Sequence, residues 1–211
     1  MVRIISADDP ECLEAAAAVL RGGGLIVFPT DTVYGLGALA RDDVAVLRLF
    51  RAKGRAPDRA LPLLLADRAD LEAVTATVPA AAETLMERFW PGGLTIVLPR
   101  SPRFHSLALA GGDTVGVRIP DHALAREMIR RAGGPIVGTS ANRSGRASPL
   151  TVAEAIEQVE ADLAVDGGRC RGGTESTVID ITTEPWILRE GLISSEEIEE
   201  ALGVHVAMGE Q

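Results

Sequence analysis

Four short polar segments of this sequence contain the residue types that hold anions in proteins, and apolar stretches separate them. They are Pro29–Gly35 (PTDTVYG), Lys53–Arg59 (KGRAPDR), Thr114–Arg118 (TVGVR) and Ser140–Gly145 (SANRSG). An ammonium offers a phosphate a point charge, a guanidinium offers a planar fork, and hydroxyl and amide groups donate hydrogen bonds. Together such segments could bind a small polyanion such as a nucleotide. Taken singly, each also fits ordinary turn chemistry or a solvated loop.

The second segment is distinctive because Lys53 is the single lysine in a chain with twenty arginines. Where nearly every cation is arginine, a remaining lysine suggests a position that needs an ammonium rather than a guanidinium. Arg55 and Arg59 follow in the same short segment. The segment could therefore clamp a chain of phosphates.

Arg118 lies inside an apolar strand segment, between Val117 and Ile119. Alternation along a strand puts Thr114, Gly116 and Arg118 on one face. A buried guanidinium needs an anionic partner. That partner is either a carboxylate of the protein or a carboxylate or phosphate of a ligand.

Charge is unevenly distributed along the chain. The net charge is −9, which argues against a protein that coats nucleic acid. Residues 41–68 nevertheless carry a net charge of +3, and residues 100–148 carry a net charge of +5. If these two stretches meet in the folded chain, they form an anion site on an otherwise acidic body.

Several common motifs are absent or incomplete. The segment 35–40 (GLGALA) matches a dinucleotide pattern, but no helix opens within it, so flexible or closely packed strand glycines are the better interpretation. No P-loop is present, and no His or Cys spacing fits a zinc site, so we predict no metal site on the protein. Ser140 and His122 resemble part of a serine hydrolase, but the second glycine of a nucleophile elbow is missing.

Strand and helix patterns are interleaved along the chain, although not strictly. Strands are expected at 3–5, 25–28, 32–40, 61–65, 94–98, 115–119, 136–137, 176–181 and 186–189. Helices are expected at 8–20, 42–51, 79–89, 121–131, 151–160 and 195–202. In helix 42–51, Val44, Leu47 and Phe50 should share the core face, and Lys53 should lie in the loop 53–60. This order predicts an α/β (α+β-like) fold with a mixed sheet.

Length and cysteine content limit the class of protein further. The 211 residues suit a single domain over residues 1–211. Two cysteines fit a reducing compartment and exclude a disulfide framework. No apolar run approaches a membrane span, and the first residues contain no apolar signal segment, so we expect a cytoplasmic protein.

The ordered set of segments resembles the YrdC-like family, the threonylcarbamoyl-AMP synthases, in a short form without an extra C-terminal domain. The matching sequences are PTDTVYGLG (29–37), KGR (53–55), WPGGLTIVL (90–98), VRIP (117–120), SANRSG (140–145) and STVID (176–180). The resemblance implies a twisted mixed β-sheet flanked by helices around a large basic cavity. It also implies a nucleotidyltransferase that forms L-threonylcarbamoyladenylate and pyrophosphate from L-threonine, bicarbonate or CO2, and ATP.

The same resemblance implies partners and residue roles. The product would serve the threonylcarbamoyladenosine modification of tRNA through a separate transferase complex, with tRNA itself as a potential contact. The residues that match the catalytic group around the ATP phosphates are Lys53, Arg55, Ser140 and Asn142. Further ATP contacts are Arg59, Thr114, Gly138, Ser148 and Arg189. Positions around the threonine are Thr32, Arg118 and Ser176, so Arg118 would pair with the substrate carboxylate. Mg²⁺ would be carried by the ATP phosphates.

This chain departs from the family pattern at a few positions, and two other interpretations stay open. Leu64 stands near a histidine of some longer relatives, and Ala56 stands where proline often follows the K-x-R triplet. One alternative is a YrdC-like paralogue that binds nucleotide, double-stranded RNA or tRNA without synthase activity. The other is a carbamoyl-transfer module like those inside hydrogenase-maturation proteins, although no acylphosphatase or zinc-finger-like segment accompanies it here.

Overall fold

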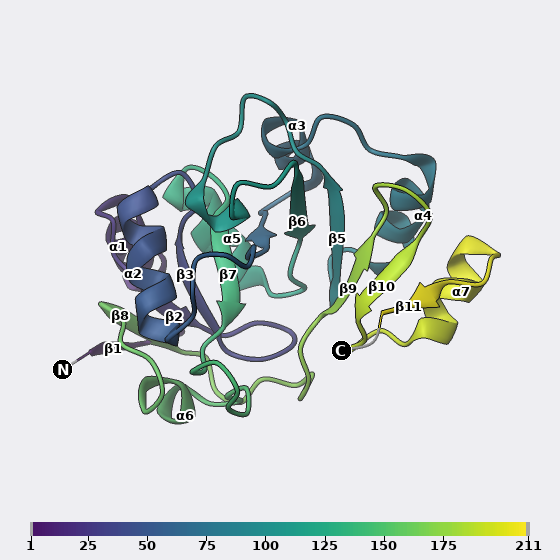
Figure 1. Ribbon diagram of the computed structural model, residues 1–211. Helices are drawn as coiled ribbons and strands as arrows, with labels where there is room; N and C mark the ends of the chain where they lie inside the picture. The colour runs from purple at the N-terminus through teal and green to yellow at the C-terminus, as the bar shows by residue number, and fades with distance from the viewer. Residues whose placement is uncertain (1, 210–211) are drawn as a thin grey trace.

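Eleven strands form one mixed sheet in residues 2–209, the part of the chain described by this computed structural model (Figure 1). The strands are β1 (Arg3–Ser6), β2 (Ile26–Phe28), β3 (Gly35–Leu39), β4 (Leu63–Leu64), β5 (Leu94–Pro99), β6 (Thr114–Arg118), β7 (Ile136–Ser140), β8 (Leu163–Asp166), β9 (Thr177–Asp180), β10 (Trp186–Arg189) and β11 (Ala207–Met208). Their order across the sheet is β1-β8-β2-β3-β7-β4-β6-β5-β9-β10-β11. Parallel and antiparallel neighbours both occur, so the mixed sheet predicted from the sequence is confirmed.

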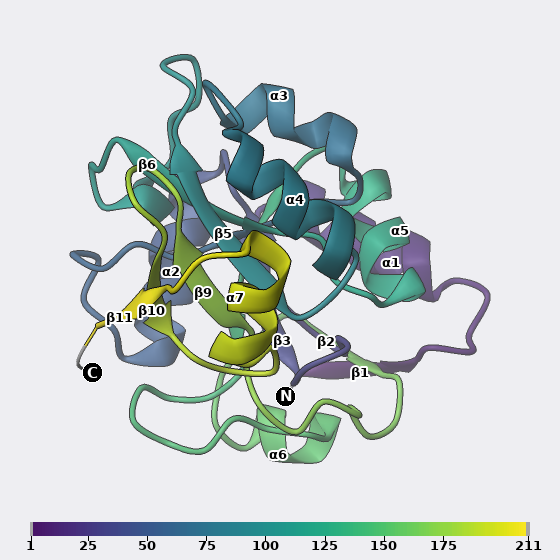
Figure 2. The ribbon, with the colours of Figure 1, turned by 90° about the vertical axis from the view of Figure 1, so that its right-hand side faces the viewer.

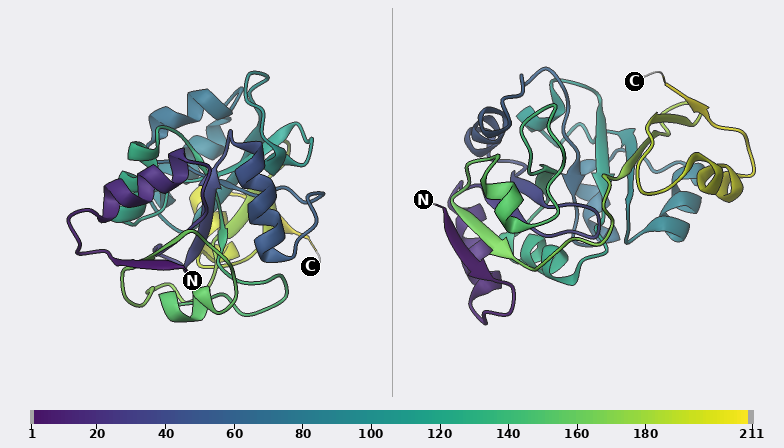
Figure 3. Two further views of the ribbon diagram at one scale, coloured as in Figure 1. Left: turned by 90° about the vertical axis from the view of Figure 1, so that its left-hand side faces the viewer. Right: turned by 90° about the horizontal axis from the view of Figure 1, so that it is seen from below.

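Helices cover both faces of this sheet. They are α1 (Cys12–Arg21), α2 (Asp43–Lys53), α3 (Leu71–Val74), α4 (Ala80–Phe89), α5 (Ala123–Ala132), α6 (Val152–Ile156) and α7 (Ser195–Leu202), with 3-10 turns η1 (Arg68–Asp70) and η2 (Leu107–Leu109). Helices α1 and α5 pack together over one face, and α7 packs beside α4 (Figure 2). Figure 3 shows β1 and β11, the two edge strands, at opposite ends of the molecule.

Two hydrophobic cores arise because alternate strand residues point to opposite faces. In β2, Ile26 and Phe28 belong to the core under α1 and α5, whereas Val27 belongs to the core that contains α2 and α4. Since β2 is buried on both sides, its three residues are all apolar.

On the face covered by α1 and α5, a cavity lies next to these helices, over β7 and its neighbours toward β10. In β7, Ile136 lies in the core with α5, and Gly138, on the same face, lines the cavity. In β6, the cavity side carries Thr114, Gly116 and Arg118, and the two valines between them join the opposite core. The face predicted for Arg118 is therefore confirmed.

The glycines of β3 make room for an aromatic ring. A Cβ atom on Gly35 or on Gly37 would lie 2.9 Å from an atom of the Phe28 ring on the neighbouring strand. Close packing between strands therefore accounts for this Gly-x-Gly sequence, as the sequence interpretation expected.

Helix α2 differs from its expected form in two ways. It continues to Lys53, so this residue is a buried helical residue, 3% exposed, and not part of a loop. The expected core face was also wrong, because Val44 is 71% exposed and points to solvent. The buried residues of α2 are Ala45, Val46, Leu49, Phe50 and Lys53. Asp42 caps the helix through the Val44 and Ala45 amides, and the α-helical period from that start turns this set toward the sheet.

Other differences concern the ends and the number of elements. Strand β7 extends through Ser140, which was expected in a loop, and α6 ends at Ile156 rather than near residue 160. Strands β8 and β11 were not expected, since each is short and forms only by pairing with distant segments. None of the helices in residues 2–209 is long and apolar enough to traverse a lipid bilayer.

Candidate functional site

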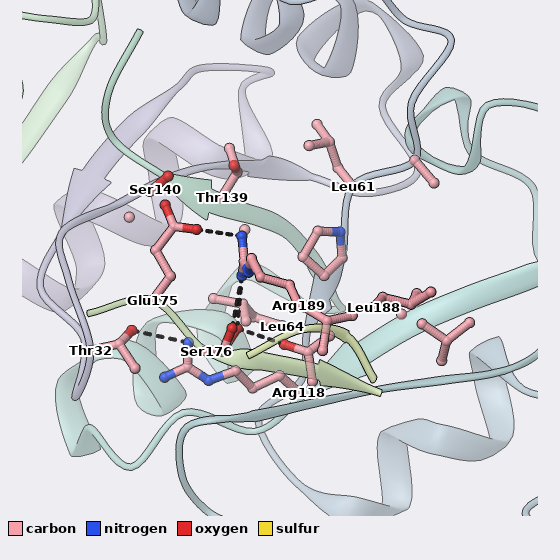
Figure 4. Close-up of a pocket in the computed structure, with 18 of the residues that line it drawn as sticks. Thr32, Leu61, Leu64, Arg118, Thr139, Ser140, Glu175, Ser176, Leu188 and Arg189 are labelled. Atoms are coloured by element: carbon pink, nitrogen blue, oxygen red, sulfur yellow. Dashed lines mark hydrogen bonds and ion pairs between the residues drawn. The ribbon is translucent and has the colours of Figure 1, made fainter. Parts of the chain in front are cut away.

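A cavity of about 370 Å³ lies on the same face of the sheet as α1 and α5, beyond these helices, and is bordered by β3, β7, β4, β6, β5, β9 and β10 (Figure 4). At one end it is lined by Thr32, Arg118 and Ser176. Toward the other end lie Thr114 on β6 and Leu188 on β10. The cavity is therefore polar at the first end and partly apolar at the second, as in sites that bind small molecules with polar and apolar parts.

A second, basic pocket adjoins this cavity. The two share the lining residues Arg55, Thr139, Ser140, Glu175 and Arg189. The basic pocket is lined by four cationic side chains, Lys53, Arg55, Arg59 and Arg189, and by two carboxylates, Asp58 and Glu175, a net charge of +2. The two basic stretches noted in the sequence therefore meet here, because Lys53 of the first contacts the 140–142 segment of the second.

Lys53 is the centre of a compact hydrogen-bond network. Its Nζ donates to the carbonyl oxygen of Ser140 (2.5 Å), to the carbonyl oxygen of Asn142 (2.9 Å) and to Asn142 Oδ1 (3.2 Å). Asn142 Oδ1 also accepts from Ser140 Oγ (2.6 Å), and its Nδ2 donates to the Arg146 carbonyl (2.5 Å). All three protons of the ammonium are thus engaged, so Lys53 organises the 140–146 loop and adds its charge to the pocket.

Burial lowers the pKa of Lys53 to about 8, because the charged form is poorly solvated, and the negative charge of Glu175 opposes this shift. Below that pH the ammonium is charged, and above it the side chain becomes neutral. The guanidinium groups of the pocket stay charged throughout. If the pocket binds ATP, as the family resemblance implies, we expect that affinity to fall as the pH rises through about 8.

Calorimetric titration with ATP between about pH 7 and pH 9.5 checks this expectation. The Lys53→Met variant is the control, and it should bind ATP more weakly, without a comparable decline over the same range. A wild-type affinity that is constant across pH 8 would show that the Lys53 charge does not contribute.

Arg118 has a carboxylate of the protein as its partner. Its Nη2 pairs with Asp31 Oδ1 (2.5 Å), its Nη1 donates to Thr32 Oγ1 (3.1 Å) and its Nε donates to the Gly92 carbonyl (2.8 Å). The side chains of Arg118 and Asp31 are only 7% and 13% exposed. The sequence left open whether a carboxylate of the protein or an anionic ligand would pair with Arg118, and the structure shows the protein carboxylate. Since three of five N–H donors are in use, two remain for a ligand in the cavity.

Two buried donors in the basic pocket have no acceptor among residues 2–209. They are Arg55 Nε and Arg189 Nε. The other guanidinium nitrogens of Arg189 pair with Glu175 and donate to the Ser176 carbonyl (2.8 Å). Buried polar groups nearly always find a partner, and each one left without costs about 1–3 kcal/mol. Neither nitrogen has accessible surface, so each becomes available to an anion in the pocket only when its side chain moves.

The structure gathers the twelve residues that the resemblance selected. The cavity is lined by Thr32, Thr114, Arg118, Gly138 and Ser176, the basic pocket by Lys53, Arg59 and Asn142, and both by Arg55, Ser140 and Arg189. Ser148 lies behind them, and its Oγ donates to Glu175 Oε1 (2.6 Å). The serine-hydrolase alternative has no support in the hydrogen bonds of residues 2–209. There His122 caps α5 at the Ala125 amide (3.4 Å), and Ser140 Oγ bonds to Asn142.

Sequence reasoning missed two carboxylates of the site. Asp31 was seen only as part of a polar segment, and Glu175 was not selected at all. Glu175 precedes Ser176 in an irregular stretch, where no periodicity points to its side chain. In residues 2–209 no group of three His, Cys, Asp or Glu side chains is arranged to hold a metal ion.

Comparison with models of known protein families identifies the family of this chain. The model of the Sua5/YciO/YrdC family, described as "Telomere recombination", matches residues 18–191. The chain belongs to this family. The family resemblance and the mixed-sheet fold predicted from the sequence are thereby confirmed.

Individual members of the Sua5/YciO/YrdC family show how far the similarity extends. The chain is 43% identical over 210 residues to the threonylcarbamoyl-AMP synthase of Bacillus subtilis (strain 168), covering 97% of this chain and 60% of that protein. It is 37% identical over 215 residues to a putative threonylcarbamoyl-AMP synthase of Mycobacterium tuberculosis (strain ATCC 25618 / H37Rv), covering 98% of both. The crystal structure of P. abyssi Sua5 complexed with L-threonine superposes with a TM-score of 0.91 at 41% identity, covering 99% of this chain and 62% of that one. The chain thus spans about 60% of the length of the Bacillus and P. abyssi relatives.

Proposed function

We propose that this protein forms L-threonylcarbamoyladenylate and pyrophosphate from L-threonine, bicarbonate or CO2, and MgATP. The observation that carries this proposal is the convergence of Lys53, Arg55, Arg59 and Arg189 on one pocket of net charge +2. Phosphate oxygens are the acceptors that best suit paired guanidinium groups. The Bacillus relative, named a threonylcarbamoyl-AMP synthase, supports the choice of reaction.

ATP and L-threonine occupy different parts of the two connected spaces. The phosphates of ATP lie in the basic pocket against Arg55, Arg59 and Arg189, above the loop that Lys53 organises. The nucleoside extends into the cavity toward Thr114 and Gly138. Ser140 and Asn142 border the phosphates, and Ser148, whose Oγ donates to Glu175, lies behind this wall. Mg²⁺ arrives as part of the nucleotide substrate.

L-Threonine binds at the other end of the cavity, beside Thr32, Arg118 and Ser176. Three of the five N–H groups of Arg118 bond to the protein, and the other two are available to the threonine carboxylate. Ser176 Oγ bonds to Thr95 Oγ1 (2.9 Å), which fixes this hydroxyl on the cavity floor. The crystal structure of P. abyssi Sua5 with L-threonine supports this choice of amino acid.

The chemistry requires positioning rather than a protein nucleophile. The neutral threonine amine adds to CO2 and releases one proton to solvent, which forms a carbamate anion, and a carbamate oxygen then attacks the α-phosphorus of ATP. The bond from that phosphorus to the bridging oxygen breaks, and pyrophosphate leaves with the electron pair. The site holds the reactants in line and places fixed positive charge where the leaving group gains negative charge. The mixed anhydride is then consumed by a separate transferase that modifies adenosine in tRNA.

The deciding experiment measures pyrophosphate release while the substrates are omitted in turn. We expect release only when L-threonine, bicarbonate and MgATP are all present, with L-threonine preferred over L-serine. Release with ATP alone, or with another amino acid preferred, would exclude the assignment. Binding of ATP or tRNA without any release would instead identify a nucleotide- or RNA-binding paralogue.

A further inference from the structure

A carboxylate of the protein occupies the position where the basic pocket meets the cavity. Among residues 2–209, Glu175 is the only acidic residue that lines both spaces. It pairs with Arg189 and accepts a hydrogen bond from Ser148 Oγ (2.6 Å), as Figure 4 shows for the Arg189 contact. Burial alone would raise the pKa of Glu175, but the hydrogen bond from Ser148 and the charges of Arg189 and Lys53 outweigh it and lower this pKa. The group is therefore an anion held by cations of the phosphate pocket.

Glu175 uses the same donors that a phosphate group would use. A carboxylate presents two acceptor oxygens, and a guanidinium fork binds it as it binds phosphate. While Glu175 holds Arg189 and the Ser148 hydroxyl, these groups are not free for a ligand. Arg55 Nε and Arg189 Nε have no acceptor but also no accessible surface, so they become available only when these side chains move. The pocket is thus partly occupied by an internal anion.

The backbone of Glu175 is held on both sides, but its side chain reaches solvent. The Leu192 amide donates to the Glu175 carbonyl (2.9 Å), and upstream the Gly173 amide donates to the Thr32 carbonyl (3.2 Å). A Cβ atom on Gly172 would lie 2.6 Å from the Asp31 carbonyl oxygen, so the segment before Glu175 packs tightly against the segment that leads into β3. The Glu175 side chain is 28% exposed. Its carboxylate can therefore leave Arg189 by rotation of the side chain, without opening of the loop.

We propose that Glu175 is an internal competitor that makes this pocket selective for a chain of phosphates over a single phosphate. The inference rests on the proposed nucleotide site and adds a specificity-determining residue to it. Any phosphate must displace Glu175 from Arg189 and Ser148. A single phosphate exchanges one anion for another and gains few new contacts. A triphosphate also spans to Arg55 and Arg59, and these contacts offset the lost internal ion pair. Selectivity is the difference between the two affinities.

Calorimetric titration of the Glu175→Gln variant with inorganic phosphate and, separately, with MgATP tests this inference. We expect phosphate to bind to Glu175→Gln at least about tenfold more tightly than to the wild type, a gain in binding free energy of about 1.4 kcal/mol. The affinity for MgATP should change by a smaller factor. The ratio of the MgATP affinity to the phosphate affinity should therefore be lower in the variant than in the wild type. Glu175→Ala should act in the same direction, since it also removes the carboxylate. Glu184→Gln, an exposed residue between β9 and β10, makes the same change in net charge and should leave both affinities unaltered.

Three results would overturn the inference. Weaker or unchanged phosphate binding in both Glu175 variants, with thermal midpoints near the wild-type value, would make Glu175 a support for Arg189 only. An equal gain for phosphate and MgATP, or the same gain in Glu184→Gln, would indicate a general charge effect without selectivity. In these cases MgATP binding by the wild type leaves the proposed function standing. A wild type and variants that bind neither ligand would overturn both proposals.

Discussion

Replacing Lys53 by alanine is expected to lower the rate of adenylate formation by a factor of about 10² to 10³. The substitution removes a fixed positive charge from the phosphate pocket. It also leaves the carbonyl oxygens of Ser140 and Asn142 and the Oδ1 of Asn142 without their shared donor. Pyrophosphate release that depends on L-threonine and bicarbonate measures the effect.

Lys53→Arg is the matched control, because it retains the charge but changes its shape. The planar guanidinium cannot direct its donors to three acceptors around one point, so we expect little recovery of activity. Both variants should fold, with a loss in the free energy of unfolding of about 1–3 kcal/mol from the unsatisfied acceptors. Full activity in Lys53→Ala would contradict the assigned role, and an unfolded variant would make Lys53 a residue of the core.

The largest effect on stability is expected for Arg118→Met. It leaves Asp31 as a nearly buried carboxylate without its cation, and breaking such a pair from one side costs about 3–5 kcal/mol. Adding Asp31→Asn should recover part of this loss, since the remaining group is then uncharged. Urea denaturation of the two variants, read as the free energy of unfolding, checks both statements.

The exposed pair of Arg48 and Asp162 provides the comparison for Arg118. Its side chains are each 43% exposed, so Arg48→Met should cost less than about 1 kcal/mol. If Arg118→Met lowered the free energy of unfolding no more than Arg48→Met, then the ion pair with Asp31 would not be required for stability. If the double variant were less stable than Arg118→Met, coupling between the two charges would not explain the loss.

Local patterns accounted for much of the fold, whereas the residues of the candidate site were selected by the family resemblance. Alternation in Thr114–Arg118 identified the cavity face of β6, because side-chain direction in a strand follows directly from residue order. The mixed sheet followed from strands that succeed one another without an intervening helix, such as β9 and β10. Short elements were less predictable. Strand β8 is stable only between β1 and β2, and no local signal reports such pairing.

By itself, the sequence determined which residue types form the site: one lysine, several arginines and a set of hydroxyls, in an order that matches a family. The partners of these residues were decided by the tertiary structure. Arg118 pairs with Asp31, which lies 87 positions away in the chain, and Lys53 holds carbonyl groups of Ser140 and Asn142. Glu175 reaches Arg189 from the loop before β9. A charge acquires its role from the groups that replace water around it, and burial by distant segments brings those groups together.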